Sequence, residues 1–341
     1  MKQNQFLLEL GVEELPEKQI TIACNSVKLS FANFLKENKL NCSGYKVSGT
    51  PRRIFLQAID LDSHQKDEEI VKTGPAFRLA YDEAGNLTNA GKGFLKRNQV
   101  EESAIFIQET DKGKFLAVKY IKTGISTGEL LQKWIPDMIL QIPFDKKMLW
   151  NKPGFAFSRP LRWLLILLNN NPLTIDFFGI PCGNTTYGNR YLGLDRCITI
   201  NKAEEYIPKL LEHKVVAEID ERRKEIVDQM ANIFPKGDYR VIKDLPLVET
   251  VVNLVEFPTA VCGEFEHKYL SLPDKIIIST ISQAQKYFAV HDTIGKLSNK
   301  FVFISNGDPA AWDLIKQGNE KVVNARLADA LWYWNEDTKH P

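Results

Sequence analysis

Basic residues beside aromatic or turn residues recur along this chain, and their chemistry suits a nucleic acid. They stand in the stretches TPRRI, GKGFLKR, FDKKMLW, FSRPLRW and QKYF, and again in the segment 318–334. Arg and Lys bind phosphates, while aromatic rings stack on unpaired bases. The alternative is that such neighbours are packing and cation–π contacts inside ordinary domains. The candidate contacts to RNA or to a protein partner are Arg52, Arg53, Lys92, Lys96, Arg97, Lys146, Lys147, Arg159, Arg162, Lys286, Lys321 and Arg326.

The sequence lacks the motifs of a self-contained enzyme. The segment 85–93, GNLTNAGKG, resembles a phosphate-binding loop, but five residues separate Gly85 from Gly91, and Gly93 replaces the Ser or Thr that binds Mg²⁺. His291 and Asp292 form a pair in an expected turn, and the other histidines are scattered without ligand spacing. No G-x-S-x-G or H-E-x-x-H motif is present. We therefore expect no catalytic, cofactor-binding or metal-binding residue in this chain.

The segment 318–334 predicts a helix. Its apolar residues recur at helical spacing, which is typical of a buried stripe on an amphipathic helix. We expect Arg326 and Asp329 to brace the domain and Lys321 to face RNA or a partner. The predicted stripe consists of Val322, Val323, Leu327, Ala330, Leu331 and Trp334.

Composition limits the class of protein. A chain of 341 residues with 44% hydrophobic and 26% charged residues is typical of a globular protein of two or three domains. Its net charge of +1 requires any nucleic-acid contact to come from local patches. Five cysteines without a C-x-x-C pair predict buried, reduced thiols. Neither the N-terminal segment, broken by three glutamates, nor the short run WLLILL resembles a membrane anchor, so we expect a cytoplasmic protein.

Strand-like and helix-like segments alternate, which predicts an α+β fold of several modules with mixed and antiparallel sheets. The segment 103–122 reads as a hairpin around Asp-Lys-Gly, and opposed charges within 201–234 predict helices that connect or brace domains. The expected divisions are an N-terminal α+β module at 1–141, a β-rich module at 142–200, and a helical connector with a second α+β module at 201–341.

Seven stretches, in order along the chain, together resemble the β subunit of the bacterial heterotetrameric glycyl-tRNA synthetase. There are departures, because Val12 replaces the family's Thr, Leu149 and Asn324 stand at expected Arg positions, and Asn189 replaces a His. Each lost basic group weakens a phosphate contact at its position. The stretches are LLELGVEELP (7–16), TPRRI (50–54), KTGPAF with YDEAGNLTNAGKGFLKR (72–97), KKMLWNKPGFAFSRPLRWLLILL (146–168), YGNRYLG (187–193), QAQKYFAV (283–290) and GNEKVVNARLADA (318–330).

The resemblance implies a subunit of the ligase that joins glycine to tRNA(Gly). ATP and Mg²⁺ would be used by a separate catalytic α subunit in an α2β2 assembly, so this chain would be non-catalytic, would assemble with α and would help position tRNA. The family's HD-like and anticodon-binding domains are expected to lie outside these residues. Two alternatives stay open: an aminoacyl-ester hydrolase module with an editing role, and a scaffold without RNA contact.

Overall fold

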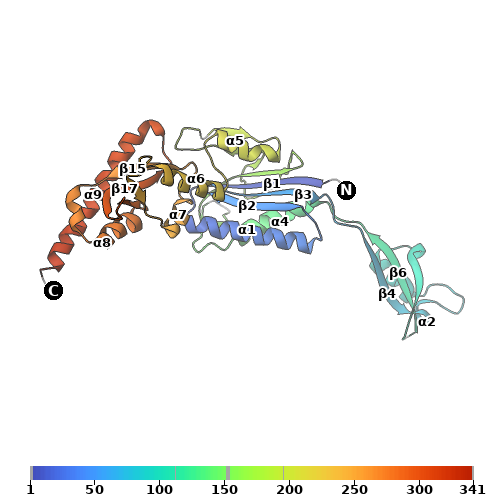
Figure 1. The fold of residues 1–341 in the computed structure, drawn as a ribbon. Helices are drawn as coiled ribbons and strands as arrows, with labels where there is room; N and C mark the ends of the chain where they lie inside the picture. Colours follow the sequence, from blue (N-terminus) through green and yellow to red (C-terminus); the bar gives the residue numbers. More distant parts are fainter. Residues whose placement is uncertain (1–2, 112, 151–153, 195, 340–341) are drawn as a thin grey trace. The chain divides into compact units, whose positions relative to one another are not determined.

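The computed structural model describes residues 3–111, 113–150, 154–194 and 196–339 (Figure 1). These residues divide into two compact units. The smaller unit is built mainly from residues 62–131 with 35–41, and the larger unit from residues 3–34, 42–61 and 132–341. Each unit is described by itself.

The larger unit contains a six-stranded sheet that brings distant parts of the chain together. Its strands lie in the order β10-β9-β1-β3-β2, and β11 pairs in parallel with β9. The apolar run WLLILL thus forms most of an interior strand that pairs antiparallel with β1. The strands are β1 (Gln3–Val12), β2 (Gly44–Thr50), β3 (Arg53–Asp62), β9 (Leu161–Leu168), β10 (Asn171–Pro172) and β11 (Cys182–Gly183).

Aromatic side chains fill the space between one face of this sheet and two helices, α1 (Glu17–Glu37) and α4 (Thr127–Gln141). Phe6 of β1 stacks on Phe31 of α1 with ring centroids 6.1 Å apart, and Trp134 of α4 lies 5.6 Å from Phe31. Successive residues of a strand point to opposite faces, so Phe6 and its neighbour Leu7 enter different layers.

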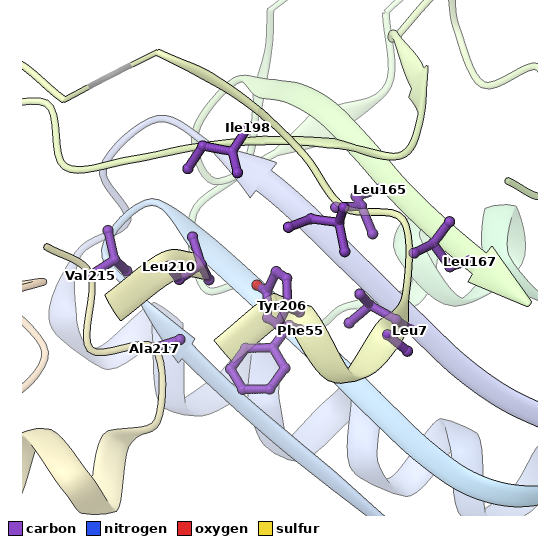
Figure 2. Packing of buried hydrophobic residues seen from close by; sticks show 11 residues of the cluster. Leu7, Phe55, Leu165, Leu167, Ile198, Tyr206, Leu210, Val215 and Ala217 are labelled. Carbon is purple, nitrogen blue, oxygen red and sulfur yellow. The ribbon is translucent and has the colours of Figure 1, made fainter. Parts of the chain in front are cut away.

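Helix α5 (Tyr206–Glu212) covers the opposite face of the sheet. Figure 1 shows α1 and α5 on opposite sides of β1 and β3, and Figure 2 shows the apolar side chains that pack between α5 and the strands. Glu9 lies two residues beyond Leu7 on β1, so its carboxylate points into this layer. The cluster consists of Leu7, Phe55, Leu165, Leu167, Ile198, Ile200, Ala203, Tyr206, Leu210, Val215 and Ala217.

A second, antiparallel sheet forms in the C-terminal part of the larger unit, in the order β14-β16-β17-β15. Along β17, Phe301 and Phe303 pack in the cluster with α8 and α9, whereas Val302 packs with α6 and α7. The sheet is thus covered on both faces. The elements are β14 (Tyr239–Val241), β15 (Thr259–Glu264), β16 (Phe288–Asp292), β17 (Leu297–Ser305), α6 (Ile219–Asn232), α7 (Leu245–Val251), α8 (Asp274–Ser279) and α9 (Trp312–Asp337).

The smaller unit is a three-stranded antiparallel sheet in the order β4-β6-β5 with two helices. The Thr88 side chain caps the longer helix by accepting a hydrogen bond from the Gly91 amide at 3.3 Å. The elements are β4 (Glu68–Ala76), α2 (Phe77–Ala80), α3 (Asn89–Asn98), β5 (Ile105–Thr110) and β6 (Gly113–Lys122).

The predicted α+β class is confirmed, as is the hairpin within 103–122, which is β5 and β6. The expected helices within 201–234 are present as α5 and α6. Helix α5 packs on the six-stranded sheet of the larger unit, and α6 packs on the second sheet. The pairing of β9 with β1 joins parts of the expected segments 1–141 and 142–200 in one sheet. The expected division into 1–141, 142–200 and 201–341 stays a prediction. His291 lies in β16 instead of the expected turn.

Candidate functional site

Arg53 lies at the start of β3 and is completely buried. Its guanidinium lies between two buried carboxylates: Nε is 3.3 Å from Oε1 of Glu256, and Nη1 is 3.7 Å from Oε2 of Glu9. Burial opposes the charged form, but the carboxylates of Glu256 and Glu9 raise the pKa of Arg53 above its ordinary value. Arg53 is therefore a charged residue of the protein interior.

The Glu9 carboxylate is the acceptor at the centre of this buried network. Thr186 Oγ1 donates to Glu9 Oε1 at 2.6 Å, and the Trp163 indole and the Tyr206 hydroxyl also donate to Glu9. Burial, with the neighbouring Glu9 charge, raises the pKa of Tyr206 well above its ordinary value, so the phenol stays a donor. A buried carboxylate is tolerated because its oxygens are occupied.

Arg52 is also interior, with 3% of its surface exposed. Its Nη1 donates to the Gly188 carbonyl at 3.3 Å, and its guanidinium lies 6.0 Å from the Trp163 ring centroid. Both arginines are therefore interior side chains of this fold, and their contact with RNA or a partner stays a prediction that burial does not favour. In the TPRRI stretch, both arginines make contacts inside the domain, including the cation–π contact of Arg52 with Trp163.

Lys92, Lys96 and Arg97 lie exposed on α3 in the smaller unit. Arg97 lines an open cleft of about 790 Å³ between α3 and β4, which Lys72 of β4 also lines. A Cβ atom at Gly74 would lie 2.7 Å from the Phe94 ring, so glycine there lets Phe94 lie against the β4 backbone. The KTGPAF and GKGFLKR stretches thus form opposite sides of one cleft.

The basic residues of α3 have no counter-charge. Elsewhere in the smaller unit Lys114 pairs with Glu109 and Lys119 with Glu69, both at 2.8 Å. Within the described residues none of the three basic side chains of α3 forms a salt bridge, and Lys72 Nζ donates to the neutral Asn98 at 3.0 Å. α3 itself contains no acidic residue. α3 therefore carries positive charges that no acidic residue of the helix offsets, and such charges attract phosphates.

Comparison with known proteins identifies the family over nearly the whole chain. A family model described as "Glycyl-tRNA synthetase beta subunit" matches residues 6–341. The chain belongs to this family. The resemblance in the sequence is thereby confirmed.

Individual relatives agree with the family match. The chain is 35% identical over 335 residues to the glycine–tRNA ligase beta subunit of Syntrophotalea carbinolica, covering 98% of this chain and 48% of the relative. For the subunits of the same name from Lactobacillus delbrueckii subsp. bulgaricus and Clostridioides difficile, the identities are 35% and 36%, over 99% and 98% of this chain and 49% and 48% of the relatives. The chain thus spans about half the length of these curated relatives.

Other family stretches provide exposed basic residues of the larger unit. Arg159 and Arg162 flank the start of β9 and are exposed. Lys146 and Lys147 are exposed just before β7 (Met148–Leu149), and Lys147 Nζ donates to the Leu140 carbonyl at 3.4 Å. For these four residues, contact with RNA or a partner stays a prediction.

Lys286 is exposed at the end of the turn that follows α8, with a positive φ of 61°. Its Nζ donates to the Gln283 carbonyl at 2.9 Å, so the side chain folds back on its own turn. Lys321 and Arg326 are exposed on α9. The structure does not test whether any of the three contacts RNA.

The segment 318–334 is helical, as predicted, but other residues brace it. Glu320 accepts a hydrogen bond from the Glu264 amide, and Asn324 accepts one from the Glu266 amide, both at 2.9 Å. Arg326 and Asp329, the residues expected to brace the domain, are both exposed. Asn324, which stands at an expected Arg position, thus accepts a hydrogen bond from a backbone amide just after β15.

The apolar stripe of α9 is narrower than predicted. Val323 and Leu327 are buried, and Ala330 and Leu331 pack against the same cluster. Trp334 is 38% exposed, and Val322 is exposed to a similar degree. The helix thus carries apolar side chains outside its packed face.

Sequence reasoning missed the buried partners Glu9, Glu256 and Arg222. Arg222 of α6 is fully buried and donates to backbone carbonyls, among them that of Gly49 at 2.6 Å. Burial lowers the pKa of Arg222 to about 10. The available signal was the charge of Glu9 inside the strand stretch LLELG, at a position that alternation directs into the core.

Three further expectations concern metals, thiols and membranes. Among the described residues, no group of three His, Cys, Asp or Glu side chains could hold a metal ion. Cys197 is exposed and the other four cysteines are partly buried, so the prediction of buried thiols is wrong for Cys197. Within the same part of the chain, no helix is long and apolar enough to cross a membrane.

Proposed function

We propose that this chain is the assembly and tRNA-positioning part of a glycine–tRNA ligase β subunit. The ligase would act in the cytoplasm as an α2β2 assembly. ATP and Mg²⁺ would bind to the α subunit, where glycine is activated, and this chain would be non-catalytic. One observation carries the RNA part of the proposal: in the described part of the chain the three basic residues of α3 form no salt bridge, and Arg97 lines an open cleft.

Charge arithmetic limits the size of the RNA contact. The basic side chains of α3 are Lys92, Lys96 and Arg97, and Lys72 of β4 lines the cleft with Arg97, against a net charge of +1 for the whole chain. Four neutralised phosphates correspond to a salt slope of about 3 to 4 on a logarithmic scale. The proposed contact is therefore weak, salt-sensitive and confined to a few phosphates.

The test compares two double variants in the ligase assembled from α and the β subunit that contains this chain. Lys96→Ala/Arg97→Ala should raise the KM for tRNA(Gly) by about tenfold and leave glycine-dependent ATP–pyrophosphate exchange unchanged, because these side chains contact RNA and not the adenylate. Lys114→Ala/Lys119→Ala removes the same charge from the same unit, but from lysines paired with glutamates. This control should stay within twofold of wild type.

Equal KM values for all three folded enzymes would refute the RNA contact and favour the scaffold alternative. Glycine-dependent exchange by this chain alone, purified free of α, would refute the assignment of chemistry to α. Hydrolysis of an aminoacyl-tRNA ester by the chain alone would favour the editing alternative, which needs a base and an activated water.

A further inference from the structure

A second cleft, in the larger unit, collects side chains from three separate family stretches. Each stretch contributes a group able to recognise a ligand. The groups are Glu13 and Glu14 from LLELGVEELP, Trp150 and Arg159 from the segment 146–168, and Arg190 and Tyr191 from YGNRYLG. Of these six residues, only Arg159 is among the contacts predicted from the sequence.

The charges of this cleft are mostly matched to one another. Glu13 accepts a hydrogen bond from Arg190 Nη2 at 2.9 Å and lies 3.5 Å from Arg162 Nε. The Tyr191 hydroxyl donates to Glu14 at 2.5 Å. Within the described residues, Arg159 forms no salt bridge and is exposed. Arg159 is thus the cation available for an anionic group.

Two aromatic rings complete the cleft. The Trp150 indole is held in place because its Nε1 donates to the Phe157 carbonyl at 3.0 Å. Tyr191 is 52% exposed, and its bond to Glu14 fixes the direction of the phenol. Held aromatic rings beside a guanidinium are the elements with which proteins bind unpaired nucleotides.

The buried network described above holds the loop that carries Arg190 and Tyr191. Arg52 donates to the Gly188 carbonyl. The buried Asn189 side chain accepts hydrogen bonds from the Tyr191 amide at 2.9 Å and the Leu192 amide at 3.2 Å. These hydrogen bonds hold the loop that carries Arg190 and Tyr191 in one conformation. A loop that is already ordered loses less entropy when a ligand binds to it.

We propose that this cleft binds an unpaired RNA nucleotide, with the base against the Trp150 and Tyr191 side chains and the phosphate on Arg159. Glu13 and Glu14 then accept hydrogen bonds from exocyclic amino groups of the base or from ribose hydroxyls. The inference rests on the proposed RNA-binding function and assigns single-stranded RNA to the larger unit, separate from the α3 face.

The test measures binding of the whole chain to two labelled probes by fluorescence anisotropy: a short single-stranded RNA and a blunt-ended RNA hairpin. Trp150→Ala and Arg159→Ala should each weaken binding of the single strand by about tenfold, the order expected for one stacked base or one phosphate contact. Trp150→Phe keeps a stacking ring and should keep most of the affinity. Affinity for the hairpin should not change.

Arg240→Ala is the charge-matched control, because Arg240 is exposed on β14 and lies outside this cleft. It should leave both affinities unchanged. The inference is overturned if Trp150→Ala and Arg159→Ala bind the single strand like wild type while Lys96→Ala/Arg97→Ala still loses hairpin affinity; the proposed function then stands. It is also overturned if the cleft variants lose association with the α subunit and keep both RNA affinities, since the cleft is then a protein interface.

Discussion

Arg52–Arg53 and Lys96–Arg97 are both adjacent basic pairs, yet the fold places them in opposite environments. The arginine pair lies at the turn between β2 and β3 and is buried, Arg53 against the carboxylates of Glu9 and Glu256 and Arg52 against the Gly188 carbonyl. The Lys96–Arg97 pair lies near the end of α3, exposed and without a salt bridge in the described part of the chain. The difference comes from acidic partners that are distant in sequence.

The distance in sequence explains why the two pairs look equivalent before folding. Glu256, the partner of Arg53, is 203 residues further along the chain. Only the fold brings it to the end of β2, where Thr50 also donates to it at 2.6 Å. Lys96 and Arg97 lie in a helix with no acidic residue, so the local sequence already indicates that their charges are not paired within the helix.

The largest effect is expected from Arg53→Ala. Removing the guanidinium leaves Glu9 and Glu256 buried without their counter-charge, which typically costs about 3–5 kcal/mol of folding free energy. Urea unfolding followed by circular dichroism measures this loss. The same variant should show weakened tRNA binding only where the fold is lost.

Arg162→Ala is the matched control for this prediction. Its guanidinium is 60% exposed and lies 3.5 Å from Glu13, so the change should cost no more than about 1 kcal/mol. If Arg53→Ala unfolds like wild type and binds tRNA less tightly, the interior role is wrong and the arginine returns to the list of RNA contacts.

The sequence predicted elements well and long-range partners poorly. The hairpin of β5 and β6 and the helix α9 follow from local patterns, because alternation and helical spacing are properties of neighbouring residues. The pairing of β9 with β1, and the burial of Arg53 beside Glu256, depend on contacts between distant segments. Chemical type alone therefore marked Arg53 and Lys96 alike, and only burial separated them.

A smaller effect is expected in the smaller unit, where Phe94 of α3 packs against Gly74 of β4. Gly74→Ala places a Cβ atom 2.7 Å from the Phe94 ring, which must move from β4. Such overpacking costs about 1–3 kcal/mol, measured by thermal unfolding. Because Phe94 and Gly74 both line the cleft with Arg97, hairpin RNA binding should weaken as well.

Gly93→Ala is the control within the same cleft. A Cβ atom at Gly93 would meet no atom within 4 Å, and alanine in a helix interior is favoured over glycine by about 0.5–1 kcal/mol. We expect a small gain in stability. A loss of stability equal to that of Gly74→Ala would mean that α3 does not pack on β4 as described.

The buried network also makes the stability of the fold depend on pH. Burial and Glu9 raise the pKa of Tyr206 well above its ordinary value near 10, so the folded state keeps the phenolic proton that the unfolded chain loses above about pH 10. This contribution to stability is complete below pH 10 and declines as the pH rises toward the folded pKa, by about 1.4 kcal/mol per pH unit. Tyr206→Phe removes the proton and this decline together.

The variant loses the hydrogen bond to Glu9, which costs about 1.5–3 kcal/mol for a charged acceptor. Urea unfolding between pH 8 and pH 11 should therefore show a less stable Tyr206→Phe variant at pH 8 whose stability falls less steeply above pH 10 than that of wild type. Tyr333→Phe, which changes an exposed tyrosine of α9, should keep the wild-type slope because Tyr206 is retained. Parallel slopes for wild type and Tyr206→Phe would show that Tyr206 titrates alike in the folded and unfolded chain, which a phenol bonded to a buried carboxylate cannot do.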